Sequence, residues 1–125
     1  MALTNAGRDL IAAMLLGEGT TDFTNANTYI GVGDSTTAFA AVQTDLQAPT
    51  NKFRQGMVAA NPSRVANVIT LNALFTGDAN FAWEEWGIFN AAAVGTMLQR
   101  KVEALGTKTS AQSWALSLTI TVSAA

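Results

Sequence analysis

The residues that could do chemistry in this sequence are carboxylates, because the chain has no histidine and no cysteine. Glu84 and Glu85 are adjacent, and adjacent side chains in a strand point to opposite faces. A glycosidase-type pair needs two carboxylates facing one gap, about 5–10 Å apart. These two therefore do not form such a pair by themselves. We expect one of them to face the sheet interior beside Gly87 or an arginine such as Arg100, in a structural ion pair or hydrogen bond.

Other candidate sites also favour structural roles. Four loop aspartates could offer oxygen ligands to calcium, but they do not follow the D-x-D-x-D-G pattern; they are Asp22, Asp34, Asp45 and Asp78. Asp34 follows a Gly-Val-Gly stretch without the G-x-G-x-x-G spacing of a phosphate-binding loop. A serine or threonine nucleophile would need a base, and no motif places one beside it. The sequence thus predicts no enzyme, no metal site and no cofactor.

Composition predicts a surface that is poor in charge. Of 125 residues, 49% are hydrophobic and 13% are charged, against about 25% charged in typical soluble domains. Small, neutral polar side chains are readily desolvated, which favours repeated protein–protein contact over a monomer with a neutral surface. Seven basic residues against nine acidic ones leave no basic patch for nucleic acid. No apolar run is long enough to span a membrane, and the N-terminus lacks the order of a signal peptide.

The chain is expected to begin with a short helix over residues 5–16. Thr4 or Asn5 can cap its N-terminus, and Gly17 can end it in a left-handed conformation. The apolar stripe that must dock on something consists of Ala6, Leu10, Ala13 and Met14, widened by Ile11 and Leu15.

The remainder predicts strands, and hence a single domain over residues 1–125 that is mainly β, an antiparallel β-sandwich with a short N-terminal helix. Residues 28–33 form a strand in which two glycines permit close approach of a backbone or an aromatic ring. Residues 39–50 are ambiguous, with one possible helical turn near Asp45. Strands are expected at 52–58, 67–75 and 113–122, together with a hairpin of 81–90 and 96–105.

Alternation along these strands assigns the two faces of each. The predicted structural core comprises Trp83, Trp86, Phe89, Trp114, Leu116, Leu118 and Ile120, with Val122 on the same face of the last strand. The opposite face of that strand gives the candidate interface, which is Ser113, Ser117, Thr119 and Thr121. A platform for stacking sugars, made of Trp83, Trp86, Trp114 and Tyr29, is the alternative interpretation of the aromatic residues.

Three segments follow one another in a familiar order: Leu3-Thr4-Asn5-Ala6-Gly7-Arg8-Asp9-Leu10-Ile11, Tyr29-Ile30-Gly31-Val32-Gly33-Asp34 and Trp86-Gly87-Ile88-Phe89-Asn90. They resemble the LT-x-AG-x-x-x-I, VGDG and EIGLFD motifs of bacteriophage tail-collar fibre N-terminal domains. The order and spacing cover nearly the whole chain. The resemblance implies a mostly β virion protein that attaches to other virion parts, and it brings no catalytic residues.

Fibre proteins of that family continue into a trimeric shaft and a receptor-binding tip, which this sequence does not show. The resemblance therefore implies a stand-alone attachment module. We expect a virion structural protein, assembled in the host cytoplasm, whose partners are itself and other virion proteins, either tail or major capsid protein. The preferred location is the tail or its fibre-attachment apparatus; a capsid decoration protein and a carbohydrate-binding host-recognition module are the alternatives.

Overall fold

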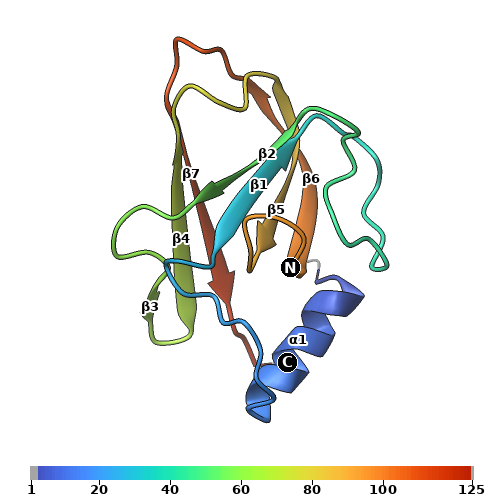
Figure 1. The fold of residues 1–125 in the computed structure, drawn as a ribbon, viewed down its shortest axis with the longest axis vertical. Coiled ribbons are helices and arrows are strands. Elements are labelled where there is room, and N and C mark those ends of the chain that lie inside the picture. Colours follow the sequence, from blue (N-terminus) through green and yellow to red (C-terminus); the bar gives the residue numbers. More distant parts are fainter. Residues whose placement is uncertain (1–2, 125) are drawn as a thin grey trace.

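The computed structural model describes residues 3–124 and confirms a mainly β, sandwich-like fold with one short helix (Figure 1). The helix α1 spans Asn5–Leu15, and the strands are β1 (Tyr29–Gly33), β2 (Lys52–Gly56), β3 (Ser63–Val65), β4 (Val68–Phe75), β5 (Ala82–Phe89), β6 (Met97–Thr107) and β7 (Trp114–Thr121). Sheet A has the order β2-β1-β5-β6, and sheet B has the order β3-β4-β7. All strand pairs are antiparallel.

The main core lies between the two sheets. It follows the alternation of the sequence in β4 and β7, whereas a register shift in β5 between Trp83 and Glu85 puts Trp83 and Trp86 in the same core. Sheet A contributes Ile30, Val32, Trp83, Trp86, Ile88 and Leu98, and sheet B contributes Leu71, Ala73, Phe75, Leu118 and Ile120. The Trp83 ring makes edge contacts with Phe75 at 4.7 Å and with Trp114 at 5.0 Å between centroids. Such pairs stabilise a core beyond their apolar burial.

The last strand buries the face that its alternation predicted. It pairs with β4 from Val68↔Thr121 to Phe75↔Trp114 without a bulge. Leu118 and Ile120 are buried, Trp114 and Leu116 are half-buried against the core, and the alternate residues are exposed. Val122 departs from the prediction, because it follows the end of β7 and is 67% exposed.

The helix is attached to sheet A through its first turn. Thr4 is the N-cap: its Oγ1 accepts from the Gly7 N–H at 2.8 Å and donates to the Met97 carbonyl at 2.5 Å. The Thr4 N–H donates to the Leu98 carbonyl at 3.1 Å. A Cβ at Gly7 would collide with that same carbonyl oxygen, so glycine is what allows the helix to touch the β6 backbone.

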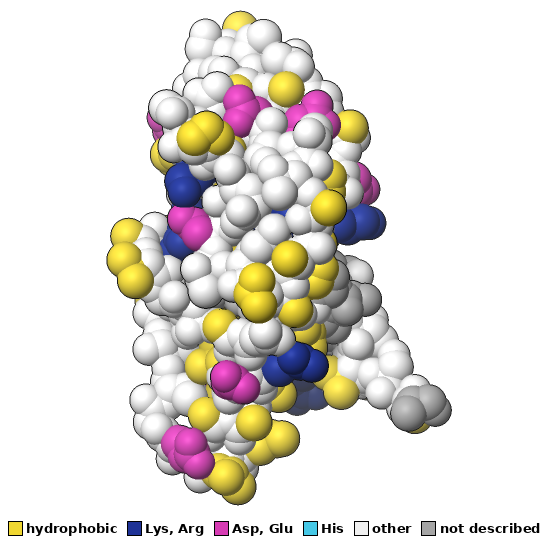
Figure 2. All heavy atoms as spheres, turned by 90° about the vertical axis from the view of Figure 1, so that its right-hand side faces the viewer, with side chains coloured by type: hydrophobic (Ala, Val, Ile, Leu, Met, Phe, Trp, Pro, Cys, Tyr) yellow, Lys and Arg dark blue, Asp and Glu magenta, His cyan; other side chains and the backbone are white. Residues whose placement is uncertain are grey.

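Two local expectations were wrong. Ile11 and Leu15 do not widen a buried stripe; they are 38% and 82% exposed, because α1 meets β6 at its first turn and then leaves the sheet. The hydrophobic side chains in the lower half of the face drawn in Figure 2 lie in the region of α1. The chain forms no helical turn near Asp45; the hydrogen-bonded turn within residues 39–50 lies at Ala41 and Val42. Residues 39–50 belong to a long irregular loop, residues 34–51, that covers the face of sheet A turned away from sheet B.

Gly7→Ala tests the attachment of the helix. Alanine favours a helix by about 1 kcal/mol over glycine, so an unhindered site would gain stability. Here the added methyl group meets the Leu98 backbone, and overpacking of this kind costs about 1–3 kcal/mol. We expect a lower urea midpoint for Gly7→Ala than for the wild type. Gly77→Ala is the control, since no atom lies within 4 Å of a Cβ at Gly77. Equal midpoints for the two variants would contradict this account.

Candidate functional site

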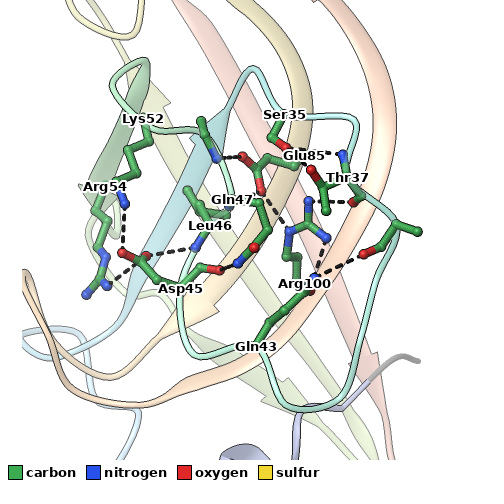
Figure 3. A network of polar contacts seen from close by, with 12 residues as sticks. Ser35, Thr37, Gln43, Asp45, Leu46, Gln47, Lys52, Arg54, Glu85 and Arg100 are labelled. Carbon is green, nitrogen blue, oxygen red and sulfur yellow. Dashed lines mark hydrogen bonds and ion pairs between the residues drawn. The ribbon is translucent and has the colours of Figure 1, made fainter.

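The strongest polar cluster is a buried ion pair on the outer face of sheet A. Arg100 Nε of β6 donates to Glu85 Oε1 of β5 at 2.7 Å, and both side chains are fully buried (Figure 3). Glu85 also accepts hydrogen bonds from the backbone N–H groups of Gln47 and Ala48, each at 2.8 Å. Three donors thus converge on one carboxylate, which is how a buried charge is compensated.

The rest of the guanidinium holds the same loop. Arg100 donates through Nη2 to the Thr37 carbonyl at 2.9 Å and through Nη1 to Gln43 Oε1 at 3.2 Å. The ion pair therefore holds the loop of residues 34–51 at two places: Glu85 binds the backbone of residues 47 and 48, and Arg100 binds Thr37 and Gln43. Because the carboxylate is enclosed and fully hydrogen-bonded, this geometry is that of a structural clamp and offers no base to a substrate.

A second, small apolar cluster lies on the same face. It consists of Leu46, Phe89 and Met97, with Tyr29 packed against it. Phe89 is thus buried, but it lies outside the core between the sheets to which its neighbours Trp86 and Ile88 belong. The Arg54 guanidinium stands over the Phe89 ring at 3.5 Å from the centroid, a cation–π contact.

The glycines of β1 provide the space for these groups. A Cβ at Gly31 would lie 2.7 Å from the Phe89 ring, and one at Gly33 would collide with the Glu85 carboxylate. The close approach of an aromatic ring that the sequence predicted is therefore real at Gly31. At Gly33 the neighbour is the buried acid, which sequence patterns alone did not indicate.

Asp45 forms an outer clamp at the edge of the same loop. It accepts from Lys52 Nζ at 2.9 Å, from Arg54 Nη2 at 3.4 Å and from the Leu46 N–H at 2.8 Å. Partial burial by itself raises the pKa of Asp45. The hydrogen bonds from Lys52 and Leu46 and the charges of Lys52 and Arg54 outweigh it, so this pKa lies below its ordinary value of 3.8.

The aspartates proposed as calcium ligands are not brought together. Asp34 accepts from Asn51 Nδ2 at 2.8 Å directly after the end of β1, and Asp45 is paired with cations. Across residues 3–124, no group of three acidic side chains is placed to hold a metal ion. Glu84 is half-buried within the irregular stretch of β5 between Trp83 and Glu85.

The aromatic residues do not form an exposed platform. Trp83 and Trp86 are buried, Trp114 is half-buried against Trp83, and Tyr29 packs in the second cluster. Trp86 Nε1 donates to Glu103 at 3.1 Å, and this hydrogen bond lowers the pKa of Glu103. Two of the four rings are thus not accessible for stacking on a sugar.

The outer face of sheet B is a regular surface without charged side chains. Cross-strand pairs on it are Val68↔Thr121, Thr70↔Thr119, Asn72↔Ser117 and Leu74↔Ala115. Ser117, Thr119 and Thr121 are exposed, and Ser113 is exposed just before the strand begins. All four residues of the candidate interface are therefore accessible, and their role in binding stays a prediction.

The motifs that resemble tail-collar domains occupy positions that hold the fold together. Thr4 and Gly7 attach α1 to β6, and Gly31 and Gly33 make room for Phe89 and Glu85. Asn90 closes the hairpin loop: its Oδ1 accepts from the Thr96 N–H at 2.8 Å, and its Nδ2 donates to the Thr21 carbonyl at 3.1 Å.

No protein-family model matches this chain, and a comparison with curated proteins finds no match either. Among residues 3–124, no helix is long and apolar enough to cross a membrane.

Glu85→Gln should break the clamp. The amide retains the size of the side chain but cannot balance the Arg100 charge, and its NH₂ group replaces an acceptor. Removing one partner of a buried ion pair costs about 3–5 kcal/mol. We expect a loss of that order in the free energy of unfolding by urea, together with faster proteolysis within residues 34–51. Glu84→Gln is the control, and an equally small effect of both changes would refute the clamp.

Asp45 predicts a dependence of stability on pH. Its pKa is lowered in the folded state, so the folded protein binds fewer protons there than the unfolded chain. The stability that it contributes is complete above its ordinary pKa and is lost as pH falls through the lower, folded value. The wild type should exceed Asp45→Asn in thermal midpoint at neutral pH, and the difference should shrink below about pH 4. A constant difference down to strong acid would contradict this assignment.

Proposed function

We propose that this chain is a bacteriophage virion structural protein, a self-associating docking module of the tail or its fibre-attachment apparatus. The observation that carries the proposal is the uncharged outer face of sheet B on a firmly clamped sandwich. Its exposed side chains are small, so ordering them on contact costs little entropy. The resemblance of three motifs to tail-collar domains supports the phage assignment. Residues of these motifs make contacts that hold the fold together, such as those of Thr4, Gly31 and Asn90.

A binding role fits the acidic residues better than a catalytic one. Glu85 is enclosed with Arg100, and Asp45 is paired with Lys52 and Arg54. Glu85 is enclosed and has no access to a substrate, and the Asp45 carboxylate is engaged by two cations, whereas general acid–base catalysis needs a group within reach of the substrate. The carbohydrate-binding alternative is weakened by the burial of Trp83 and Trp86.

The same face could instead bind a capsid lattice. A sedimentation experiment distinguishes a location in the tail from a location on the head. Labelled protein should be sedimented separately with purified tails and with DNA-free heads of the phage that carries the gene. We expect cosedimentation with tails. Binding to heads alone would identify a decoration protein and overturn the preferred location. Binding to neither, together with binding to host-surface glycans, would support the carbohydrate-binding alternative.

Thr70→Lys tests whether the face of sheet B makes the contact. Thr70 lies on the central strand of that sheet, so a lysine there adds a charge to the middle of the face without touching a sheet edge. We expect Thr70→Lys to weaken binding to tails, because the charge must be desolvated. Ser110→Lys, in the exposed turn between β6 and β7, is the control and should bind normally. Equal binding by both variants would exclude the face as the contact surface.

A further inference from the structure

The free edge of sheet B is unusual for a natural protein. Among residues 3–124, β4 is the only strand that pairs with β7. Exposed edge strands are commonly blunted by charged side chains, proline or bulges. The strand Trp114–Thr121 has none of these, since its sequence is WALSLTIT and its register with β4 is regular. It is an eight-residue template for pairing with another strand.

The direction of the backbone groups along this edge follows from one hydrogen bond. The Val122 N–H donates to the Asn67 carbonyl at 2.9 Å, which continues the register of β7 with β4. Hydrogen-bonded and non-hydrogen-bonded pairs alternate in an antiparallel ladder. Ile120 and Leu118 therefore direct their N–H and C=O groups toward β4, and Ser117, Thr119 and Thr121 direct theirs to the open edge. The Asn72 carbonyl, opposite Ser117, accordingly points away from β7 and accepts from the Val58 N–H at 3.0 Å.

The side of the sandwich beside this edge is hollowed by a cleft. A cleft of about 700 Å³ lies between β6 and β7, with Trp86, Gln99 and Lys101 on one wall and Thr119 and Thr121 on the other. Gln99 is 5% exposed, and its Oε1 is buried without a hydrogen-bond partner. Gln99 Oε1 is thus an unpaired, buried acceptor behind the wall of this cleft.

We propose that a second copy of this chain pairs with β7 through its own β7, antiparallel and about a twofold axis. The two copies of sheet B then form one continuous six-stranded sheet, and each copy covers the open side of the other. This inference rests on the self-association in the proposed function and specifies the surface responsible for it.

The strand itself indicates a second copy as the occupant. In a pair of identical strands about a twofold axis, a charged side chain would lie close to the same charge on the partner, and the two would repel each other. The strand β7 carries no charged residue, so such a pair has no repulsion of this kind. Because Ala115, Ser117, Thr119 and Thr121 present the edge groups, a hydrogen-bonded register sets members of this alternate set opposite one another. Small polar side chains then face each other on the outer side, and apolar side chains adjoin on the inner side.

Thr119→Pro is the direct test. Proline removes the N–H that points to the open edge, whereas the bonds between β7 and β4 use the neighbouring residues. Proline is tolerated at such edge positions. By sedimentation equilibrium we expect a dimer for the wild type and for Thr119→Val, which retains the N–H. We expect the dissociation constant of Thr119→Pro to rise roughly tenfold or more. Near-UV circular dichroism of the tryptophans reports whether the variant is folded.

Two variants with opposite charges at position 119 provide a second test if the proline variant does not fold. Thr119→Lys and Thr119→Glu should each be monomeric at low salt, and a mixture of the two should form dimers. A wild type that remains monomeric, or a dimer that all these variants retain, would overturn the pairing of β7. If that monomer still binds phage tails, the docking function stands and only the edge pairing fails. If the dimer forms but binds no virion part, the pairing stands and the proposed location fails.

Discussion

The buried ion pair between Glu85 and Arg100 is the constraint on which the rest of the molecule depends. Two charges removed from water destabilise a fold unless nearly all their hydrogen-bonding capacity is used. Here the compensation comes from Thr37, Gln43 and the backbone of residues 47–48, all in one loop. The pair therefore obliges an irregular loop to lie on sheet A, and the loop in turn excludes water from the pair.

This arrangement explains why glycines are needed on the outer face of sheet A. Gly31 and Gly33 leave the volume that Phe89 and the Glu85 carboxylate occupy. Leu46 of the loop packs against Phe89 and Met97, and these three residues form the second apolar cluster. Sheet A is thus covered on both faces, by sheet B on one side and by the loop on the other.

Sheet B is covered on its inner face only, which leaves its outer face open to contact with another molecule. Its outer face is neutral, and its edge strand β7 is neither blunted nor paired beyond β4 within the described chain. Most of the few charged groups of sheet A serve the loop: Glu85 and Arg100 inside it, and Lys52 and Arg54 with Asp45 at its edge. The ion pairs lie on sheet A and the proposed docking surface lies on sheet B, so a change on the outer face of sheet B need not disturb the clamp.

The amino-acid sequence by itself determined the elements whose signal is local and periodic. Alternation set the faces of β4 and β7, and the cap at Thr4 set the start of α1, since each depends on neighbours a few residues away. The pairing of Glu85 with Arg100 was also foreseeable, because both belong to one hairpin. The tertiary structure alone decided that residues 34–51 form a cover and that Phe89 lies outside the main core. It also decided that Ile11 and Leu15 stay exposed. The reason is physical: the loop has no period, and its contacts join residues as far apart as Thr37 and Arg100, 63 positions along the chain.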